Sequence, residues 1–173
     1  MKIQIIGFSG SGKSTLAKIL SDHHKISVLH LDSVHFYGDW QERTLEEQNA
    51  IVLDFMNQHS DWVIDGNYSR VAPKRFEESD LTIFLAYNRF VCYWNAWRRY
   101  RKHRGIHRFD CPCIEKFDLE FRYWILVQGR KHKRVQNMYV NFHKTQGTKL
   151  LFKNRRQLHQ WLKEQNIPYN LSK

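Results

Sequence analysis

The sequence predicts a three-layer α/β fold in which helices cover both faces of a parallel β-sheet. Two observations carry this prediction. Short apolar or β-branched runs of strand length alternate along the chain with longer segments whose apolar residues recur at helical spacing. A glycine-rich loop also joins the first such run directly to the first helical segment. Strands separated by helices pair in parallel, and ligand-binding groups then gather at the carboxyl ends of the strands.

The expected elements follow one another in a regular order. We expect strands at residues 2–6, 27–31, 62–64, 81–86 and 149–152. We expect helices at residues 15–20, 45–56, 89–104, 117–142 and 155–164. Several aromatic residues of the middle helices recur at intervals of about three and four, which we interpret as core positions: Phe90, Trp94, Trp97, Tyr123 and Trp124.

Composition and length exclude several protein classes. The 173 residues suit one domain, and 42% hydrophobic with 14% aromatic residues give enough apolar surface to exclude wholesale disorder. No apolar run approaches the ~18 residues of a spanning helix, and no signal-peptide core follows the start. The chain has three cysteines, Cys92, Cys111 and Cys113, and this odd number argues against a disulfide framework. We therefore expect a cytoplasmic protein with no membrane partner.

The strongest motif is a glycine-rich loop between the first strand and the first helix, Gly7-Phe8-Ser9-Gly10-Ser11-Gly12-Lys13-Ser14. Glycines let the backbone curl so that its N–H groups face phosphate oxygens near the positive end of the helix. The lysine would reach the β- and γ-phosphates of ATP, and Ser14 would bind Mg²⁺. The residues assigned to ATP binding are Gly7, Ser9, Gly10, Ser11, Gly12, Lys13, Ser14 and Thr15.

Two aspartates follow expected strands. Asp32 comes after the second strand, and Asp65 comes after the third in Asp65-Gly66-Asn67-Tyr68-Ser69-Arg70. A carboxylate beside a phosphate loop can hold Mg²⁺ or take a proton from an acceptor hydroxyl. The alternative is a capping or turn aspartate, a common use of Asp at a strand end. We favour a role in the reaction for both aspartates, with Asp65 binding the metal and Asp32 serving the acceptor.

Positive charge is concentrated in the second half of the chain. Residues 1–88 hold 8 basic and 12 acidic residues, whereas residues 89–156 hold 18 basic and 4 acidic residues. Such a block serves either a polyphosphate ligand or nucleic acid. We find no module that reads a nucleic-acid groove, so DNA is an alternative partner that the sequence does not favour.

Several of these segments resemble those of known families. The order of phosphate loop, acid after the second strand, and Asp-Gly with a following Arg is similar to the nucleoside-monophosphate kinases. Their adenylate kinases carry Asp-Gly-Phe-Pro-Arg, whereas this chain places Asn67-Tyr68-Ser69 before Arg70, which weakens AMP as the acceptor. The chain more closely resembles the bacterial "DNA topology modulation" proteins. The segments that carry this resemblance are 30–32, 38–40, 64–70, 104–110, 113–116 and 154–158.

The resemblance implies a five-stranded parallel sheet in the order 2-3-1-4-5, with a mobile helical lid at residues 105–116 inside a single domain of residues 1–173. It implies that arginines at the lid base spread positive charge over the transferred phosphoryl group. Arg134 is a further candidate for this role. We assign Arg104 and Arg108, with Lys13 and Asp32, to catalysis. Nucleotide binding is assigned to Arg99, Arg130 and Arg155, and acceptor binding to Asp32, Trp40, Asn67, Tyr68 and Arg70.

The expected lid also contains groups that bind metals. His103, His107, Cys111 and Cys113 lie close together in the sequence. Tetrahedral N/S ligation of zinc is feasible, although Cys-x-Cys is a tighter spacing than usual. The alternative, which we favour, is a lid whose thiols and imidazoles are incidental.

Together these features predict a kinase that transfers the γ-phosphate of ATP, with Mg²⁺, to an unidentified small nucleotide or metabolite. The alternative is an ATP-binding, DNA-associated regulatory protein with no small-molecule acceptor. The sequence leaves the acceptor and the oligomeric state open.

Overall fold

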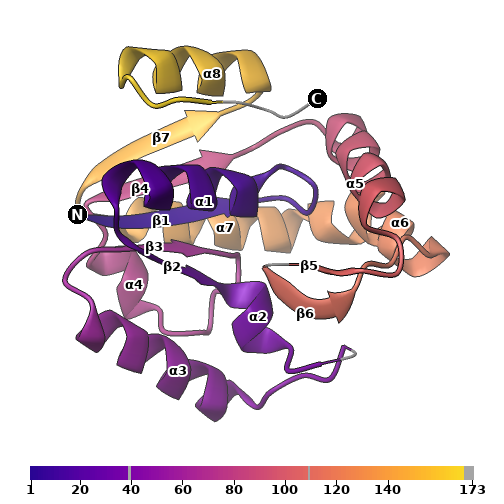
Figure 1. Cartoon of the computed structure of the whole chain (residues 1–173), viewed down its shortest axis with the longest axis horizontal. Coiled ribbons are helices and arrows are strands. Elements are labelled where there is room, and N and C mark those ends of the chain that lie inside the picture. The colour runs from indigo at the N-terminus through magenta and orange to yellow at the C-terminus, as the bar shows by residue number, and fades with distance from the viewer. Residues whose placement is uncertain (39, 109, 170–173) are drawn as a thin grey trace.

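A five-stranded parallel sheet forms the centre of the structure, a computed structural model that describes residues 1–38, 40–108 and 110–169 (Figure 1). The side chains at positions 107 and 108 lie outside the described part. The sheet strands are β1 (Lys2–Gly7), β2 (Ser27–His30), β3 (Trp62–Asp65), β4 (Leu81–Leu85) and β7 (Thr148–Phe152). Their order is β2-β3-β1-β4-β7, and every neighbouring pair is parallel.

This arrangement confirms the predicted fold class. The separate strands β5 (His107–Arg108) and β6 (Cys111–Ile114) form an antiparallel pair and do not join the main sheet. The fifth strand of the main sheet in chain order is therefore β7. Counted in this way, the observed order is 2-3-1-4-5.

Several of the helices begin at a residue whose side chain caps them. They are α1 (Lys13–His24), α2 (Leu31–His35), α3 (Leu45–Gln58), α4 (Lys74–Glu77), α5 (Arg89–His103), α6 (Leu119–Leu126), α7 (His132–Lys144) and α8 (Arg155–Glu164). Thr44 and Glu47 form a reciprocal capping box at the start of α3. Asn88 and Asn154 accept hydrogen bonds from backbone N–H groups in the first turns of α5 and α8.

Helices cover both faces of the sheet. The side chain of Phe84 on β4 contacts the rings of Tyr139 and Phe142, which places α7 on one face. Alternate strand residues point to opposite faces, and Ile3 and Leu81 line a cavity together with side chains of α1 and α8. The sheet is therefore the middle of three layers, as the sequence predicts. Its central strands are buried almost throughout, which explains their continuous apolar runs.

The predicted single helix at 117–142 is wrong. Two α-helices, α6 and α7, occupy the region and are separated by a 3-10 turn, η1 (Gln128–Arg130). Val127 leaves helical geometry at φ −127° and ψ −65°. The turn carries Arg130 back to the phosphate loop, where its guanidinium lies 3.4 Å from the ring centroid of Phe8. Apolar periodicity did not reveal this break, and Phe8, which Arg130 contacts, lies far away in the sequence.

The core assignment of the middle aromatics is also wrong for four of the five. Phe90, Trp94, Tyr123 and Trp124 are exposed, and Trp97 is half-buried. The side of α5 that faces the interior instead carries Cys92 and Ala96, which are fully buried. Small residues are needed there because the backbone of the phosphate loop packs directly against this side.

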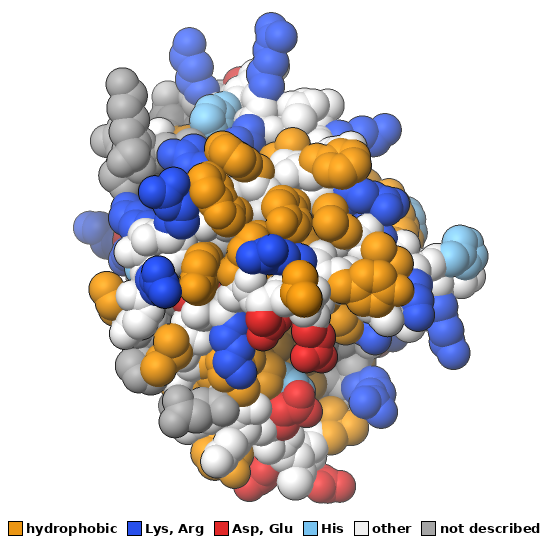
Figure 2. Space-filling model, turned by 90° about the vertical axis from the view of Figure 1, so that its right-hand side faces the viewer, with side chains coloured by type: hydrophobic (Ala, Val, Ile, Leu, Met, Phe, Trp, Pro, Cys, Tyr) orange, Lys and Arg blue, Asp and Glu red, His pale blue; other side chains and the backbone are white. Residues whose placement is uncertain are grey.

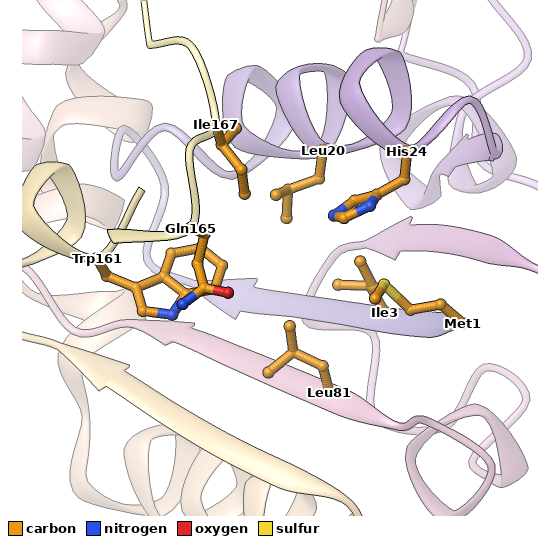
Figure 3. A pocket seen from close by; sticks show the side chains of 8 residues that line it. All are labelled: Met1, Ile3, Leu20, His24, Leu81, Trp161, Gln165 and Ile167. Atoms are coloured by element: carbon orange, nitrogen blue, oxygen red, sulfur yellow. The ribbon is translucent and has the colours of Figure 1, made fainter. Parts of the chain in front are cut away.

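Within the described ranges, no helix is both long and apolar enough to cross a bilayer. A cavity of about 100 Å³ lies between the sheet, the end of α1 and α8, and Figure 3 shows the side chains of Leu20 and Trp161 pointing into it. Met1, Ile3 and Leu81 line it from the starts of β1 and β4. It is therefore at the amino edge of the sheet, opposite the edge that holds the phosphate loop.

Candidate active site

The phosphate loop lies between the end of β1 and the start of α1, as predicted. Gly10 and Gly12 have φ angles of +80° and +92°, which residues with side chains rarely adopt. The N–H of Ser11 donates to the carbonyl of Phe8 (3.0 Å), and this bond closes the curl. Lys13 folds over the loop and donates to the same carbonyl at 3.2 Å. Burial lowers the pKa of Lys13, although the charges of Asp32 and Asp65 oppose this shift.

Two helices distant in sequence hold the loop in place. The amide of Asn95 on α5 donates to the carbonyl of Gly10 at 3.0 Å, and Arg155 on α8 donates to the same amide's oxygen at 2.9 Å. The loop backbone also approaches α5 closely, because a Cβ added at Gly10 would lie 2.2 Å from the carbonyl oxygen of Cys92. Gly10 therefore supports both the turn and its packing.

We expect Gly10→Ala to destabilise the protein by about 2–4 kcal/mol, through left-handed strain plus a clash with the Cys92 carbonyl. Gly105→Ala is the matched control, because Gly105 has φ +73° and nothing within 4 Å of the added Cβ. It should cost only about 1–2 kcal/mol. Urea unfolding curves of both variants measure the difference. Equal midpoints would contradict the close packing of loop against α5.

A hydroxyl and a carboxylate meet beside the loop. The Oγ of Ser14 donates to Asp65 Oδ2 at 2.9 Å, and Nδ1 of His30 lies 2.5 Å from Asp65 Oδ1. Both Asp65 and His30 are buried. Burial disfavours the imidazolium, but the hydrogen bond and charge of Asp65 outweigh this and raise the pKa of His30. The structure thus brings together the two residues predicted to bind metal, and adds His30 behind them.

The predicted acceptor residues Asp32 and Tyr68 also meet. Asp32 lies in the first turn of α2, and the hydroxyl of Tyr68 donates to its Oδ1 at 2.9 Å. Burial and the nearby Asp32 charge raise the pKa of Tyr68, so the phenol stays protonated. The close approach of the Tyr68 segment to α2 requires glycine at position 66, because an added Cβ there would lie 2.6 Å from Leu31 Cβ. The side-chain amide of Asn67 instead accepts a hydrogen bond from the N–H of Gly7 and donates one to its carbonyl, so it supports the phosphate loop.

Strands β5 and β6 form a β-hairpin within residues 105–116, and none of the described residues of this segment is helical, so its predicted helical character is wrong. Three contacts join its end to the rest of the site. The indole N–H of Trp40 donates to the carbonyl of Ile114 at 3.1 Å, and Lys116 lies 5.0 Å from the centroid of the Trp40 ring. Arg99 donates twice to Oε1 of buried Glu115, at 2.9 and 2.7 Å. Mobility of this segment stays a prediction.

The predicted arginines have different surroundings. Arg99 is engaged by Glu115, and Arg130 donates to the carbonyl of Tyr87 (2.8 Å) and to the sulfur of Cys92 (3.2 Å). Arg70 and Arg104 are exposed. The side chain of Arg108 lies outside the described part. Arg134 lies 4.4 Å from the ring centroid of Trp124, on the outer face of the molecule.

Arg155 lies at a small cavity of about 40 Å³ next to the phosphate loop. The hydroxyls of Ser11 and Tyr87 face this region, are buried, and have no hydrogen-bond partner among the described residues. The remaining lining residues are Gly12, Thr15, Leu158 and Tyr169. The structure therefore places a guanidinium, a tyrosine ring and two unpaired hydroxyls beside the residues predicted to bind ATP.

The zinc alternative gains no support. Among the side chains that the structure describes, no three His, Cys, Asp or Glu come together in a metal-binding group, and the side chain of His107, one of the four predicted ligands, lies outside that part. All three cysteines are free and buried. Burial, followed by the hydrogen bond to Cys113, raises the pKa of Cys111 to about 12, and burial raises that of Cys92.

All three thiols should consequently resist labelling by a disulfide reagent at pH 8 in the folded protein, because all three are buried and, for Cys111, only on the order of 10⁻⁴ of the thiol is ionised. We expect labelling at least about 100-fold slower than that of free cysteine, and rapid reaction of all three after unfolding. Labelling with and without a chelator distinguishes protection by burial from protection by zinc ligation. Rapid labelling of the folded protein, or labelling that starts only with chelator, would contradict the expectation.

Sequence reasoning assigned no role to His30, Asn95, Tyr87 or Tyr169. His30 had a detectable signal, since it is a polar residue at the end of a strand that precedes Asp32. Asn95 had a weaker one, as an amide between the buried residues Cys92 and Ala96 on the inner side of α5. Tyr87 and Tyr169 carried none that distinguishes them from core tyrosines.

No model of a known protein family and no curated protein sequence matches the chain. Solved structures do match. The shikimate kinase from Acinetobacter baumannii in complex with shikimate has a TM-score of 0.58 and 10% identity, over 96% of this chain and 94% of that chain. The shikimate kinase from Bacteroides thetaiotaomicron has a TM-score of 0.56 and 17% identity, over 95% of each chain. An uncharacterized protein from Eubacterium ventriosum has a TM-score of 0.53 and 15% identity, over 95% of this chain and 98% of that chain. These likenesses show that the chain has the α/β fold of P-loop kinase structures.

Proposed function

We propose that the protein is a kinase that transfers the γ-phosphate of ATP to a hydroxyl group of a small molecule. One observation carries the proposal: the phosphate loop, the Ser14–Asp65 pair and the Tyr68–Asp32 pair all lie at the carboxyl edge of the sheet. A phosphate cradle, a metal site and a base are the parts that phosphoryl transfer requires. The matched kinase structures agree with this proposal at the level of the fold.

The side chains present fit Mg²⁺. Ser14 Oγ and Asp65 Oδ2 are hard oxygen donors 2.9 Å apart, directly beside the loop. Bound Mg²⁺ would neutralise charge on the β- and γ-phosphates. His30 fixes the second oxygen of Asp65 and so orients the carboxylate toward Ser14. Lys13, which folds over the loop, supplies a further positive charge to the phosphates.

The remaining residues serve the two substrates. Asp32 accepts the proton of the attacking hydroxyl, and Tyr68, as a protonated donor, holds the carboxylate in place. Exposed Arg70 binds an anionic group of the acceptor, and Trp40 joins the acceptor side to the hairpin. Arg155 and Tyr169, at the cavity beside Gly12 and Thr15, hold the nucleoside part of ATP.

A screen for acceptor-dependent ADP release tests the proposal. The panel contains nucleosides, nucleoside monophosphates and small hydroxylated carboxylic acids, including shikimate, which is bound in one of the matched structures. At least one class should raise ADP release well above the rate with ATP and Mg²⁺ alone, with one phosphorylated product per ADP. Binding of ATP without stimulation by any class would contradict the kinase assignment and favour the DNA-associated alternative.

A further inference from the structure

One outer face of the protein is apolar to an unusual degree. The α5–α6 face consists of seven exposed apolar side chains on α5, on α6 and at the residue that follows α6: Phe90, Val91, Trp94, Leu119, Tyr123, Trp124 and Val127. Leu119 is 78% exposed and Phe90 is 70% exposed, so these side chains contribute little to the core. Large contiguous apolar surfaces on folded proteins mark interaction sites.

Basic side chains lie among these apolar ones. Figure 2 shows hydrophobic and Lys or Arg side chains gathered together on the side of the molecule that holds α5 and α6, with acidic side chains below them. Helix α5 contains five Lys or Arg residues and no acidic residue, whereas exposed Asp118 and Glu120 flank Leu119 at the start of α6. Phe90, Trp94, Arg98 and Arg101 lie on one stripe of α5, because they are three or four residues apart.

The partner must therefore be both apolar and anionic. This requirement argues against a second copy of the chain, since the five Lys or Arg residues of each α5 would find only Asp118 and Glu120 as acidic groups at the start of the other copy's α6. The same requirement excludes a partner that offers only charge, because such a partner would not bury the exposed side chains of Leu119, Val91 and Val127.

Single-stranded nucleic acid and a bilayer with anionic lipids both combine apolar and anionic groups. Nucleic acid uses free aromatic faces on which bases stack. Here Arg101 lies over Trp97 (5.0 Å) and Arg134 lies over Trp124 (4.4 Å). Trp94 in turn packs on Trp97, with ring centroids 4.6 Å apart. The aliphatic members offer no stacking surface, whereas a bilayer accepts Leu, Val, Trp and Tyr together.

We propose that the α5–α6 face docks on the surface of membranes that contain anionic lipids. The apolar side chains enter the headgroup boundary, and the arginines remain at the level of the lipid phosphates. Such docking departs from the expectation of no membrane partner, which rested on the lack of a spanning segment, because a protein that lies on a bilayer needs no spanning helix. The inference is independent of the proposed kinase activity, because none of the seven apolar residues lies at the phosphate loop or at the acidic pairs.

Sedimentation with vesicles tests the docking. Vesicles of phosphatidylcholine with 30% phosphatidylglycerol should retain the protein at least about tenfold better than phosphatidylcholine alone, because each basic residue near an anionic surface adds roughly fivefold. Retention should fall steeply with salt. Entry of exposed Trp94 into the boundary should also shift tryptophan emission to shorter wavelength.

Surface variants locate the contact. The double variant Phe90→Ser/Leu119→Ser should lose at least about tenfold of vesicle affinity without loss of thermal stability, since both side chains are mostly exposed. Leu53→Ser is the matched apolar control, because Leu53 is an exposed leucine on α3. For charge, Arg98→Glu should weaken binding, whereas Lys163→Glu on α8 should not.

Three results would overturn the proposal. The first is equal retention on both kinds of vesicle, or none on either. The second is unchanged retention of the double variant. The third is tight binding of a single-stranded oligonucleotide that the double variant loses while vesicle binding is weak, which would assign the face to nucleic acid instead.

Discussion

Replacement of Lys13 by Met should abolish phosphoryl transfer while leaving the fold intact. Lys13 contacts the loop carbonyl of Phe8 through its terminal amine, whereas the core next to it is built from Leu16, Ala17 and Leu20. The ammonium stabilises negative charge that grows on the transferred phosphoryl group in a region of low dielectric constant. Removing one such donor typically costs about 3 kcal/mol or more, equivalent to a loss of at least ~10² in turnover.

ADP release with the acceptor that the screen identifies measures this loss, and thermal unfolding monitors the fold. Lys18→Met is the matched control, because Lys18 lies on the same helix with an exposed side chain paired to Asp22. It should keep full activity. Wild-type turnover and ATP affinity in Lys13→Met would remove the basis for assigning the loop to ATP.

Substitutions of the two aspartates should separate their roles. Asp32→Asn should lower turnover by about 10²–10⁴-fold with little change in the KM for ATP, because it removes the proton acceptor at the acceptor site. Asp65→Asn should instead raise the Mg²⁺ concentration needed for half-maximal rate, since Asp65 shares the metal site with Ser14.

Magnesium titrations of turnover with each variant make the comparison. Tyr68→Phe is a useful companion, because it keeps the carboxylate of Asp32 but removes the hydrogen bond that holds it. It should lower turnover less than Asp32→Asn does. If both aspartate variants change the magnesium requirement identically, the division into metal residue and acceptor residue is wrong.

The central sheet and the phosphate loop could be predicted because their signals are local. The sequence from Gly7 to Ser14 specifies its own backbone through glycines with positive φ. The predicted helix at 155–164 agrees with α8 residue for residue, and Asn154 caps its start. The meeting of Ser14 with Asp65 followed from a general rule, because parallel strands end at one edge of the sheet.

The roles of the individual arginines could not be predicted from such local signals. Arg99 and Glu115 are 16 residues apart and Asn95 and Gly10 are 85 residues apart, so no local pattern connects them. A run such as Arg98 to Arg104 shows a charged helix, but which arginine faces inward depends on what lies beneath the helix. The same holds for the aromatics of α5 and α6, whose spacing identifies a helix face without stating whether anything covers it.

The sequence by itself thus determined the class of fold, the phosphate loop and the edge of the sheet at which the acids meet, because backbone preferences and strand polarity act over short stretches of chain. Only the tertiary structure decided that β5 and β6 pair as a hairpin, that the helix at 117–142 breaks at Val127, and that Asn67 and His30 support the site from behind. It also decided that the α5–α6 face is left uncovered. These outcomes depend on which distant surfaces fit together, and that fit is a property of the packed molecule.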